Sequence, residues 1–286
     1  IIIAIILLLT YQTSLQAGTT PTLENTTKLY VATFNRAPDA GGLDYWANDA
    51  GLDLEGIAKS FFDQPETKEA YPADSSNTDF VEAVYQNLFN RASEAAGLEY
   101  WVAELDSGRI AKSTFILAVI NGAQDTEEFG NDATILTHKT TVGLSFSYAG
   151  FNDTTDAREI MLEVTDDEGT VTAALEGYGI EVLPTARELL VGKTYYDAWV
   201  SDGVEGYAKL AFSETEITED YYTDNIQQES SLSSYEILEH SIILIDDDGQ
   251  SSCDVSGNDT AIQFTCKNDN GGMVYWLFGV LWKMLE

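Results

Sequence analysis

The chain has 286 residues, of which 44% are hydrophobic and 11% aromatic, so it can bury a sizeable core in two or three modest domains. Its 48 Asp and Glu residues outnumber 14 Lys and Arg residues and give a formal net charge of −34 at pH 7. No basic surface of useful size can form from this composition, which argues against sequence-independent nucleic-acid binding and against docking on anionic lipid. The same charge keeps copies of the chain soluble and favours divalent cations as partners.

The N-terminus carries an apolar run over residues 1–9, which is followed by polar and small residues up to Ala17. Nine apolar residues are too few for a membrane-spanning helix, which needs about 20. The run matches the apolar centre and small-residue end of a secretory signal, so we expect residues 1–17 to be the remnant of an export signal, truncated at its front. A buried strand is the alternative. Export predicts a secreted, extracellular or cell-surface protein that is not an integral membrane protein.

An internal repeat is the most informative feature of the sequence. Residues 29–46 and 84–101 align with ten identities in eighteen positions, and the same Ile-Ala-Lys-Ser follows at residues 57–60 and 110–113. A period near 55 residues predicts one supersecondary unit that occurs twice.

Each repeat unit has the pattern of three helices. In the second copy, apolar residues between Val81 and Phe89 recur at helical spacing, and this helix is expected to end at Asn90. Asp39 is a natural N-cap for a second helix. A third helix is expected through residues 57–62 in the first copy and 110–120 in the second.

The motif Leu-Tyr-x3-Phe-Asn-Arg-x-Pro-Asp-x2-Gly-Leu-x-Tyr-Trp resembles the DUF4214 repeat, a helical module frequent in exported bacterial surface proteins. The resemblance implies two tandem copies, at about residues 27–70 and 79–124, with a helical extension over residues 125–178. The second copy departs from the motif, with Ser93 in place of Pro and Ala96 in place of the first Gly. The family has no established biochemical activity, so the resemblance implies an extracellular bacterial scaffold rather than a reaction.

The polar and aromatic residues of the two copies are candidates for a ligand site, because aromatic faces beside carboxylates can bind sugars. The candidate residues are Arg36, Tyr45, Trp46, Arg91, Tyr100 and Trp101. The alternative is a structural role, in which Tyr45 and Trp46 pack on Tyr30 and Phe34 while Arg36 and Asp44 tie the loop. The ligand hypothesis requires Trp46 or Trp101 to be exposed.

From about Gly192 the helical spacing gives way to short β-rich runs separated by turn signals. The expected strands lie at residues 194–200, 206–212, 217–223, 235–245, 261–266 and 273–278. We therefore predict an α+β protein, with an all-helical repeat domain over residues 18–180 and an antiparallel β domain over residues 181–286. The β domain is either a sandwich or a small lipocalin-like barrel, and a barrel can hold a small apolar ligand or be filled by its own side chains.

Two further features lie in the predicted β domain. Cys253 and Cys266 are the only cysteines, and in an exported chain they predict a disulfide across a hairpin that turns near Gly257. The acidic loop Asp246, Asp247 and Asp248 offers oxygen ligands for calcium, although its spacing does not match an EF-hand. Calcium is the only metal ion that we consider as a candidate ligand, and we expect no required cofactor.

The sequence carries none of the familiar catalytic motifs, and its only histidines, His138 and His240, lie in different predicted domains. We therefore expect no enzymatic activity. The predicted function is that of an exported cell-surface or extracellular-matrix protein, in which a helical scaffold carries a β interaction domain. Such a protein would be self-assembling or adhesive, as a homo-oligomer or cell-envelope component. The alternative is a binding module whose β domain takes up a small apolar ligand or a glycan.

Overall fold

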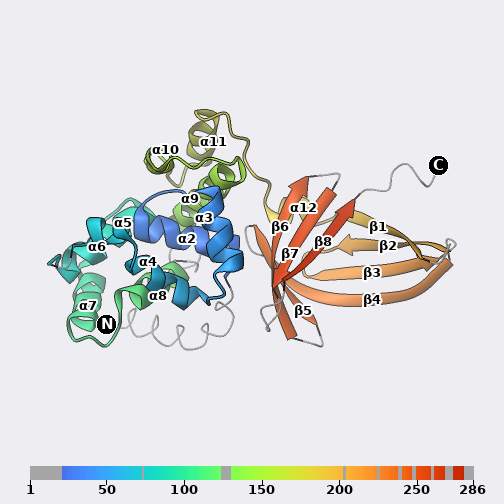
Figure 1. Cartoon of the computed structure of the whole chain (residues 1–286), viewed down its shortest axis with the longest axis horizontal. Helices are drawn as coiled ribbons and strands as arrows, with labels where there is room; N and C mark the ends of the chain where they lie inside the picture. Colours follow the sequence, from blue (N-terminus) through green and yellow to red (C-terminus); the bar gives the residue numbers. More distant parts are fainter. Residues whose placement is uncertain are drawn as a thin grey trace. The chain divides into compact units, whose positions relative to one another are not determined.

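The computed structural model of the chain describes residues 21–72, 74–123, 130–201, 204–223, 226–237, 240–246, 249–258, 261–267 and 273–279 (Figure 1). The expected export signal at residues 1–17 lies outside these residues. The chain divides into two compact units, Ile1–Leu183 and Pro184–Glu286, which we call the helical unit and the barrel unit. The sequence analysis had placed its boundary after residue 180.

The helical unit is built from short helices. They are α2 (Leu23–Phe34), α3 (Ala40–Asp44), the π-helical turn η1 (Tyr45–Asp49), α4 (Leu54–Phe62), α5 (Pro65–Ala70), α6 (Asn77–Phe89), α7 (Ala95–Asp106), α8 (Lys112–Gly122), α9 (Gly130–Tyr148), α10 (Thr154–Glu159) and α11 (Glu168–Glu176). Helices α2 and α6 are corresponding elements of the two copies. Each begins at a hydroxyl N-cap, Thr22 or Ser76, and each ends at an asparagine in the left-handed conformation, Asn35 or Asn90.

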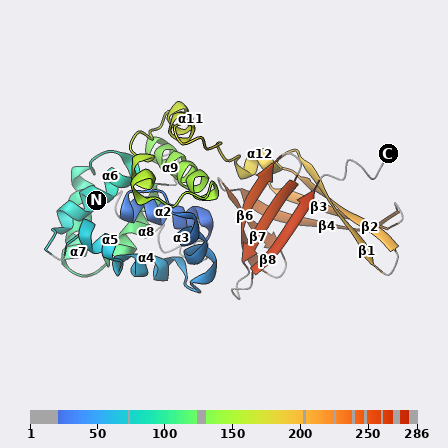
Figure 2. The ribbon, with the colours of Figure 1, turned by 45° about the horizontal axis from the view of Figure 1, so that its top comes forward.

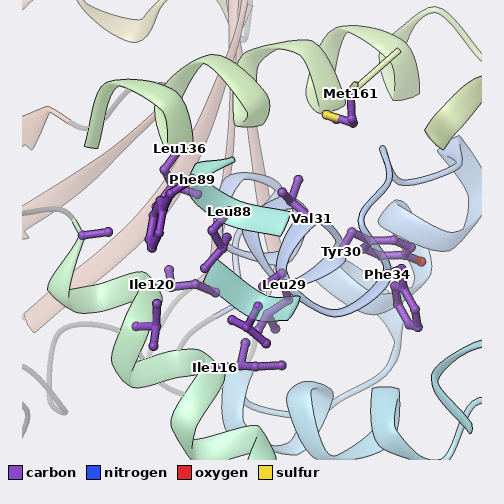
Figure 3. Close-up of a cluster of buried hydrophobic side chains, with 14 of the residues drawn as sticks. Leu29, Tyr30, Val31, Phe34, Leu88, Phe89, Ile116, Ile120, Leu136 and Met161 are labelled. Carbon is purple, nitrogen blue, oxygen red and sulfur yellow. The ribbon is translucent and has the colours of Figure 1, made fainter. Parts of the chain in front are cut away.

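Helix α2 forms the centre of the helical unit. Nearly all of its residues are buried, and it packs against α9, α6, α8 and α4. Figure 3 shows Leu29 and Val31 of α2 among side chains from neighbouring helices, including Leu88 of α6 and Ile116 of α8. A fully buried leucine stabilises the folded state by about 1.5–3 kcal/mol, so this shared core joins the two copies into one structure.

The barrel unit is an antiparallel sheet of eight described strands. They are β1 (Thr194–Ser201), β2 (Val204–Phe212), β3 (Glu216–Thr223), β4 (Ile226–Ile237), β5 (Ser241–Asp246), β6 (Gly249–Asn258), β7 (Ala261–Lys267) and β8 (Met273–Gly279). The strands are neighbours in chain order, and a pair between Tyr196 of β1 and Gly279 of β8 closes the barrel. Figure 2 shows β6, β7 and β8 side by side. The fold class is α+β as predicted, and the β domain is a curled barrel rather than a sandwich.

The strand prediction needs two corrections. The run expected at residues 235–245 belongs to two strands, the end of β4 and β5. Strand β6 and the first half of β4 were not predicted, because their sequences, rich in Ser, Gln and Gly, lack the apolar alternation that marks a half-buried strand.

The apolar core of the barrel unit lies at the end where the short helix α12 (Ala186–Leu190) packs. The hydroxyl of Tyr195 donates to the carbonyl oxygen of Leu189 at 2.5 Å, which fixes α12 to the start of β1. Phe212 contacts the rings of Tyr195, Tyr235 and Phe264, and thereby fills this end with aromatic side chains. Helix α12 was not predicted from the sequence.

Candidate functional site

The first repeat copy surrounds a buried arginine, Arg36, just after the end of α2. Its guanidinium lies over the rings of Tyr30 and Phe34, with its central carbon 5.0 and 5.4 Å from the ring centroids. Nε and Nη2 donate to the carboxylate of Glu66 in α5, at 3.0 and 3.1 Å. Nη1 donates to the carbonyl oxygen of Ala37 at 2.9 Å. All three nitrogens of the guanidinium are therefore engaged within the protein.

The second copy repeats this arrangement around Arg91. Its guanidinium lies over the rings of Tyr85 and Phe89, at 5.5 and 5.8 Å. Nε donates to one oxygen of Asp132 in α9 at 2.8 Å, and Nη2 donates to the other. Nη1 donates to the carbonyl oxygen of Ala92 at 2.9 Å. We call each set of an arginine, two rings and a bidentate carboxylate an arginine knot.

The two knots recruit their bidentate carboxylates from different elements. Glu66 belongs to α5 and also accepts from Nη2 of Arg158 at 2.7 Å, so the first knot reaches α10. Asp132 stands in the first turn of α9. A second acid follows each arginine, with Asp39 at 3.7 Å from Arg36 and Glu94 at 2.7 Å from Arg91. The number of residues between the arginine and its bidentate carboxylate differs between the two copies. The alignment of the two copies therefore does not reveal which carboxylate binds either arginine.

The tryptophans of the two copies contact the knots and the third helix of each unit. Trp46 packs edge-on against Phe61, with centroids 5.4 Å apart, and Trp101 packs in the same way against Phe115 at 5.2 Å. The side chain of Trp46 is hydrogen-bonded to Tyr30. Because an indole N–H can only donate, the hydroxyl of Tyr30 accepts.

The exposure of the predicted ligand residues differs between the copies. Trp101 is 5% exposed, whereas Trp46 is half-buried. Tyr45 is 50% exposed and its ring contacts that of Trp46, while Tyr100 is half-buried against Trp101. The structure therefore brings each arginine and the tryptophan of its copy to the same knot. The preceding tyrosine, Tyr45 or Tyr100, contacts the tryptophan ring and is more exposed to solvent than the arginine's own ring partners.

The expected role of Asp44 was wrong. Its carboxylate accepts from Nδ2 of Asn48 at 2.8 Å within the same helical segment, and the acids that bind Arg36 are Glu66 and Asp39.

Burial in the knots changes the acidity of the tyrosines. Burial, with a smaller contribution from the nearby Glu94 carboxylate, raises the pKa of Tyr85 to about 12. Burial likewise raises the pKa of Tyr30 well above its usual range, and the Asp39 carboxylate adds to the effect. Both phenols therefore stay neutral even at pH values somewhat above 10, and the face of each neutral ring lies against a guanidinium.

The features predicted in the β domain have different outcomes. Cys253 of β6 and Cys266 of β7 lie directly opposite each other and form the expected disulfide across this hairpin. Asp246 is the last residue of β5, and its side chain lies outside the described part of the chain, as do Asp247 and Asp248. Among the side chains that are described, no three His, Cys, Asp or Glu residues gather as they would around a metal ion.

Sequence reasoning missed a buried lysine in α9. Lys139 is 1% exposed, and its Nζ donates to the carbonyl oxygen of Asn87 at 2.5 Å and to Oδ1 of Asn90 at 2.7 Å. Burial lowers the pKa of this ammonium to about 8. The lysine caps the C-terminal end of α6, where a cation meets free carbonyl groups and the negative end of the helix dipole. Only its place among the apolar and small residues of α9 could have indicated burial.

Residues 58–129 match a family model described as "Domain of unknown function (DUF4214)". The matched segment begins within α4 and extends past α8, so it covers the second repeat copy and the end of the first. No curated protein and no solved structure matches the chain. Among the described helices, none has both the length and the apolar character that crossing a membrane requires. Within its helical unit, the chain therefore carries a segment similar to the DUF4214 family.

Proposed function

We propose that the protein is a non-enzymatic, exported cell-surface or extracellular-matrix protein of a bacterium, in which the helical unit is a scaffold and the barrel unit makes the contacts. The pair of arginine knots carries this proposal. Every guanidinium nitrogen of Arg36 and Arg91 donates to an oxygen of the chain itself, and the bonds to Glu66 and Asp132 hold helices together instead of binding a ligand.

We also propose that both copies of the internal repeat are DUF4214 repeats in tandem. The correspondence of the two knots supports it, because each has the same pair of rings, the same bond from Nη1 to the following carbonyl and the same tryptophan contact. Shared contacts of this kind are expected of duplicated modules that pack into a common core.

The disulfide supports export. Disulfides persist in oxidising compartments and are rare in the cytosol, and the Cys253–Cys266 bridge is the only cysteine pair in the chain. Fractionation of the source cells, with free thiols blocked at lysis, tests this part of the proposal. We expect the protein in the envelope or medium fraction, with both cysteines resistant to alkylation until a reductant is added. Recovery in the cytosol with free thiols would contradict export.

Calcium bridging between acidic faces belongs to the same proposal, because divalent cations can join surfaces that otherwise repel each other. Size-exclusion chromatography with light scattering, with calcium and then with a chelator, tests it. Assemblies that need calcium, and that are lost when Asp246, Asp247 and Asp248 are replaced by Asn, would support the bridge. The same mass in both conditions would contradict it.

A glycan-binding barrel is the second candidate, and one observation favours it. Glu219 and Tyr221 of β3 pair with Leu210 and Ala208 of β2, so they lie on the same face of the sheet as the buried core. The carboxylate of Glu219 accepts from the hydroxyl of Tyr221 at 3.0 Å. A half-buried carboxylate beside a tyrosine ring suits sugar hydroxyl groups.

Calorimetric titration with oligosaccharides tests this candidate. Binding that is lost in Glu219→Gln but kept in Glu216→Gln, an exposed acid of the same strand, would support the glycan site. Binding that is equal in both variants would contradict it.

A further inference from the structure

Strand β4 is much longer than its contact with β5. Residues 216–223 of β3 pair along almost the whole of β4, whereas β5 pairs only with residues 234–237. In the part of the chain that the structure describes, no strand pairs with residues 226–233 on the side away from β3. Figure 1 shows this half of β4 continuing along the edge of the sheet beyond β5. Among the described residues of the barrel unit, this half of β4 is therefore a free strand edge.

The direction of the backbone groups along this edge follows from one hydrogen bond. The N–H of Tyr235 donates to the carbonyl oxygen of Thr215, on the β3 side, at 2.8 Å. Successive residues of an antiparallel strand direct their N–H and C=O groups to opposite sides. The register is regular from Ser234 back to Glu229, and Gln228 then has no partner, because Glu229 pairs with Tyr221 and Gln227 pairs with Tyr222. The N–H and C=O groups of Leu232 and Ser230 therefore point away from β3, toward the free edge.

Natural strand edges are protected from pairing between molecules by lysine, proline or bulges. A bulge at Gln228 interrupts the start of β4, and residues 229–233 beyond it have none of these features. Residues 226–233 contain no lysine or proline, and Glu229 is their only charged residue in a chain with a formal charge of −34. Leu232 is 63% exposed on this strand, and the neighbouring Ser230 and Ser231 are exposed as well.

We propose that β4 pairs with β4 of a second copy of this chain, antiparallel and about a two-fold axis at Ser231. This arrangement aligns residues 229–233 of the two copies, beyond the bulge, over about 17 Å. It places Ser230 opposite Leu232 of the second copy, where the backbone groups of both point to the interface, and Glu229 opposite Ser233, so no like charges lie directly opposite each other. A symmetric interface of this kind covers both free edges at once.

A second copy suits this edge better than a free peptide. Strand β3 already holds β4 in an extended conformation, so two such strands join without ordering a flexible chain, whereas a peptide must lose that entropy on binding. The inference deepens the proposed function, because it names the surface through which the barrel unit assembles. It rests on that function only in treating the barrel unit as the part that makes contacts.

Sedimentation velocity of the full-length chain, over a range of concentrations and salt, tests the proposal. We expect a monomer–dimer equilibrium that tightens as salt screens the repulsion between two acidic copies. Ser230→Pro removes an N–H from the free edge of both copies, and we expect about tenfold to hundredfold weaker dimerisation. Leu232→Pro should act in the same way.

Controls separate association from folding. Ser230→Ala loses the bond from the serine hydroxyl to Asp220 but keeps the backbone N–H, so it should dimerise like the wild type. Ser231→Pro removes an N–H that points to β3, so it should lower the thermal stability, whereas Ser230→Pro should leave it nearly unchanged. Circular dichroism and melting curves measure both effects.

Two results would overturn the proposal. The first is a wild-type chain that stays monomeric at every concentration and salt. The second is a folded Ser230→Pro variant that dimerises as tightly as the wild type. Unfolding of both Ser230→Pro and Leu232→Pro would also overturn it, because these N–H groups would then be needed inside the barrel. None of these results depends on the location of the protein in the cell. The experiment therefore distinguishes failure of the proposed β4 pairing from failure of the proposed export.

Discussion

Gly42 and Gly97 occupy the same position in the two copies but have different surroundings. A Cβ atom at Gly42 would lie 2.6 Å from the hydroxyl of Tyr30 and 2.8 Å from the carboxylate oxygens of Asp39. At Gly97 the nearest such atom is the hydroxyl of Tyr85, at 4.0 Å. The first copy therefore needs a glycine for close packing, and the second does not.

We expect Gly42→Ala to lower the free energy of unfolding by about 1–3 kcal/mol, because the added methyl group displaces the knot tyrosine and the N-cap of α3. Gly97→Ala should be neutral or slightly stabilising, because alanine is the better helix former. Urea unfolding of the two variants measures the difference. Equal effects at both positions would show that the knots do not pack as described.

Lys139 gives the helical unit a defined pH dependence. Its pKa is about 8 in the folded chain, below the ordinary value of 10.5, so between these values the unfolded state binds more protons. The contribution of Lys139 to stability therefore rises with pH in this window, by at most about 1.4 kcal/mol per pH unit. Tyr85 and Tyr235 have the opposite effect on stability above about pH 10. Burial raises the pKa of both to about 12, so the folded state binds more protons there and their contribution to stability falls as the pH rises.

The replacement Lys139→Met isolates this effect. The wild type should gain stability relative to Lys139→Met as the pH rises from about 8 to 10, and the remaining charges of the chain cancel in the comparison. Urea unfolding of both proteins across this range provides the measurement. Parallel pH profiles would mean that Lys139 is not buried as an ammonium at neutral pH.

At the scale of the elements, the knots join helices that are distant in the sequence. Arg91 follows α6 and Asp132 begins α9, and the side chain of Asp132 is nearly inaccessible to solvent. The first knot joins α2 to α5 and α10 through Glu66 and Arg158. The knots therefore fix the helical extension to the repeats.

A double-mutant cycle tests this connection. Arg91→Met leaves the Asp132 carboxylate buried without its partner, so we expect a loss of about 2 kcal/mol or more in the free energy of unfolding. Adding Asp132→Asn to that variant should recover part of the loss, because no uncompensated charge remains. Arg109→Met breaks an exposed ion pair with Glu104 and should have little effect. Additive losses in the cycle would contradict a coupled pair.

The elements also show what the sequence could predict. Helix α6 was found because its apolar residues recur at the period of a helix, and strands β2 and β3 were found as β-rich runs between turn signals. Strand β6 was missed because it is held by pairing with β5 and β7, although its own residues are mostly polar or small. Likewise, Glu66 and Asp132 could not be identified as partners of the arginines, because tertiary packing brings them there from outside the repeat motif.

At the scale of the whole molecule, the two units have different features. The helical unit keeps Arg36 and Arg91 and their ring and carboxylate partners inside two knots, next to a shared core. The barrel unit has an apolar cluster beside α12 and, among its described residues, a strand edge whose backbone groups have no partner strand on one side. The acidic composition argues against nucleic-acid binding, and that stays a prediction. Composition cannot place a contact surface, because the proposed edge is defined by backbone pairing.

The proposed place of the protein is the outside of the cell, and labelling of intact cells tests this proposal. Antibodies raised against the full chain would be applied to cells of the source organism before and after permeabilisation, with a cytosolic protein as the control. We expect strong labelling of intact cells that increases little on permeabilisation. Labelling that appears only after permeabilisation, in parallel with the cytosolic control, would contradict it.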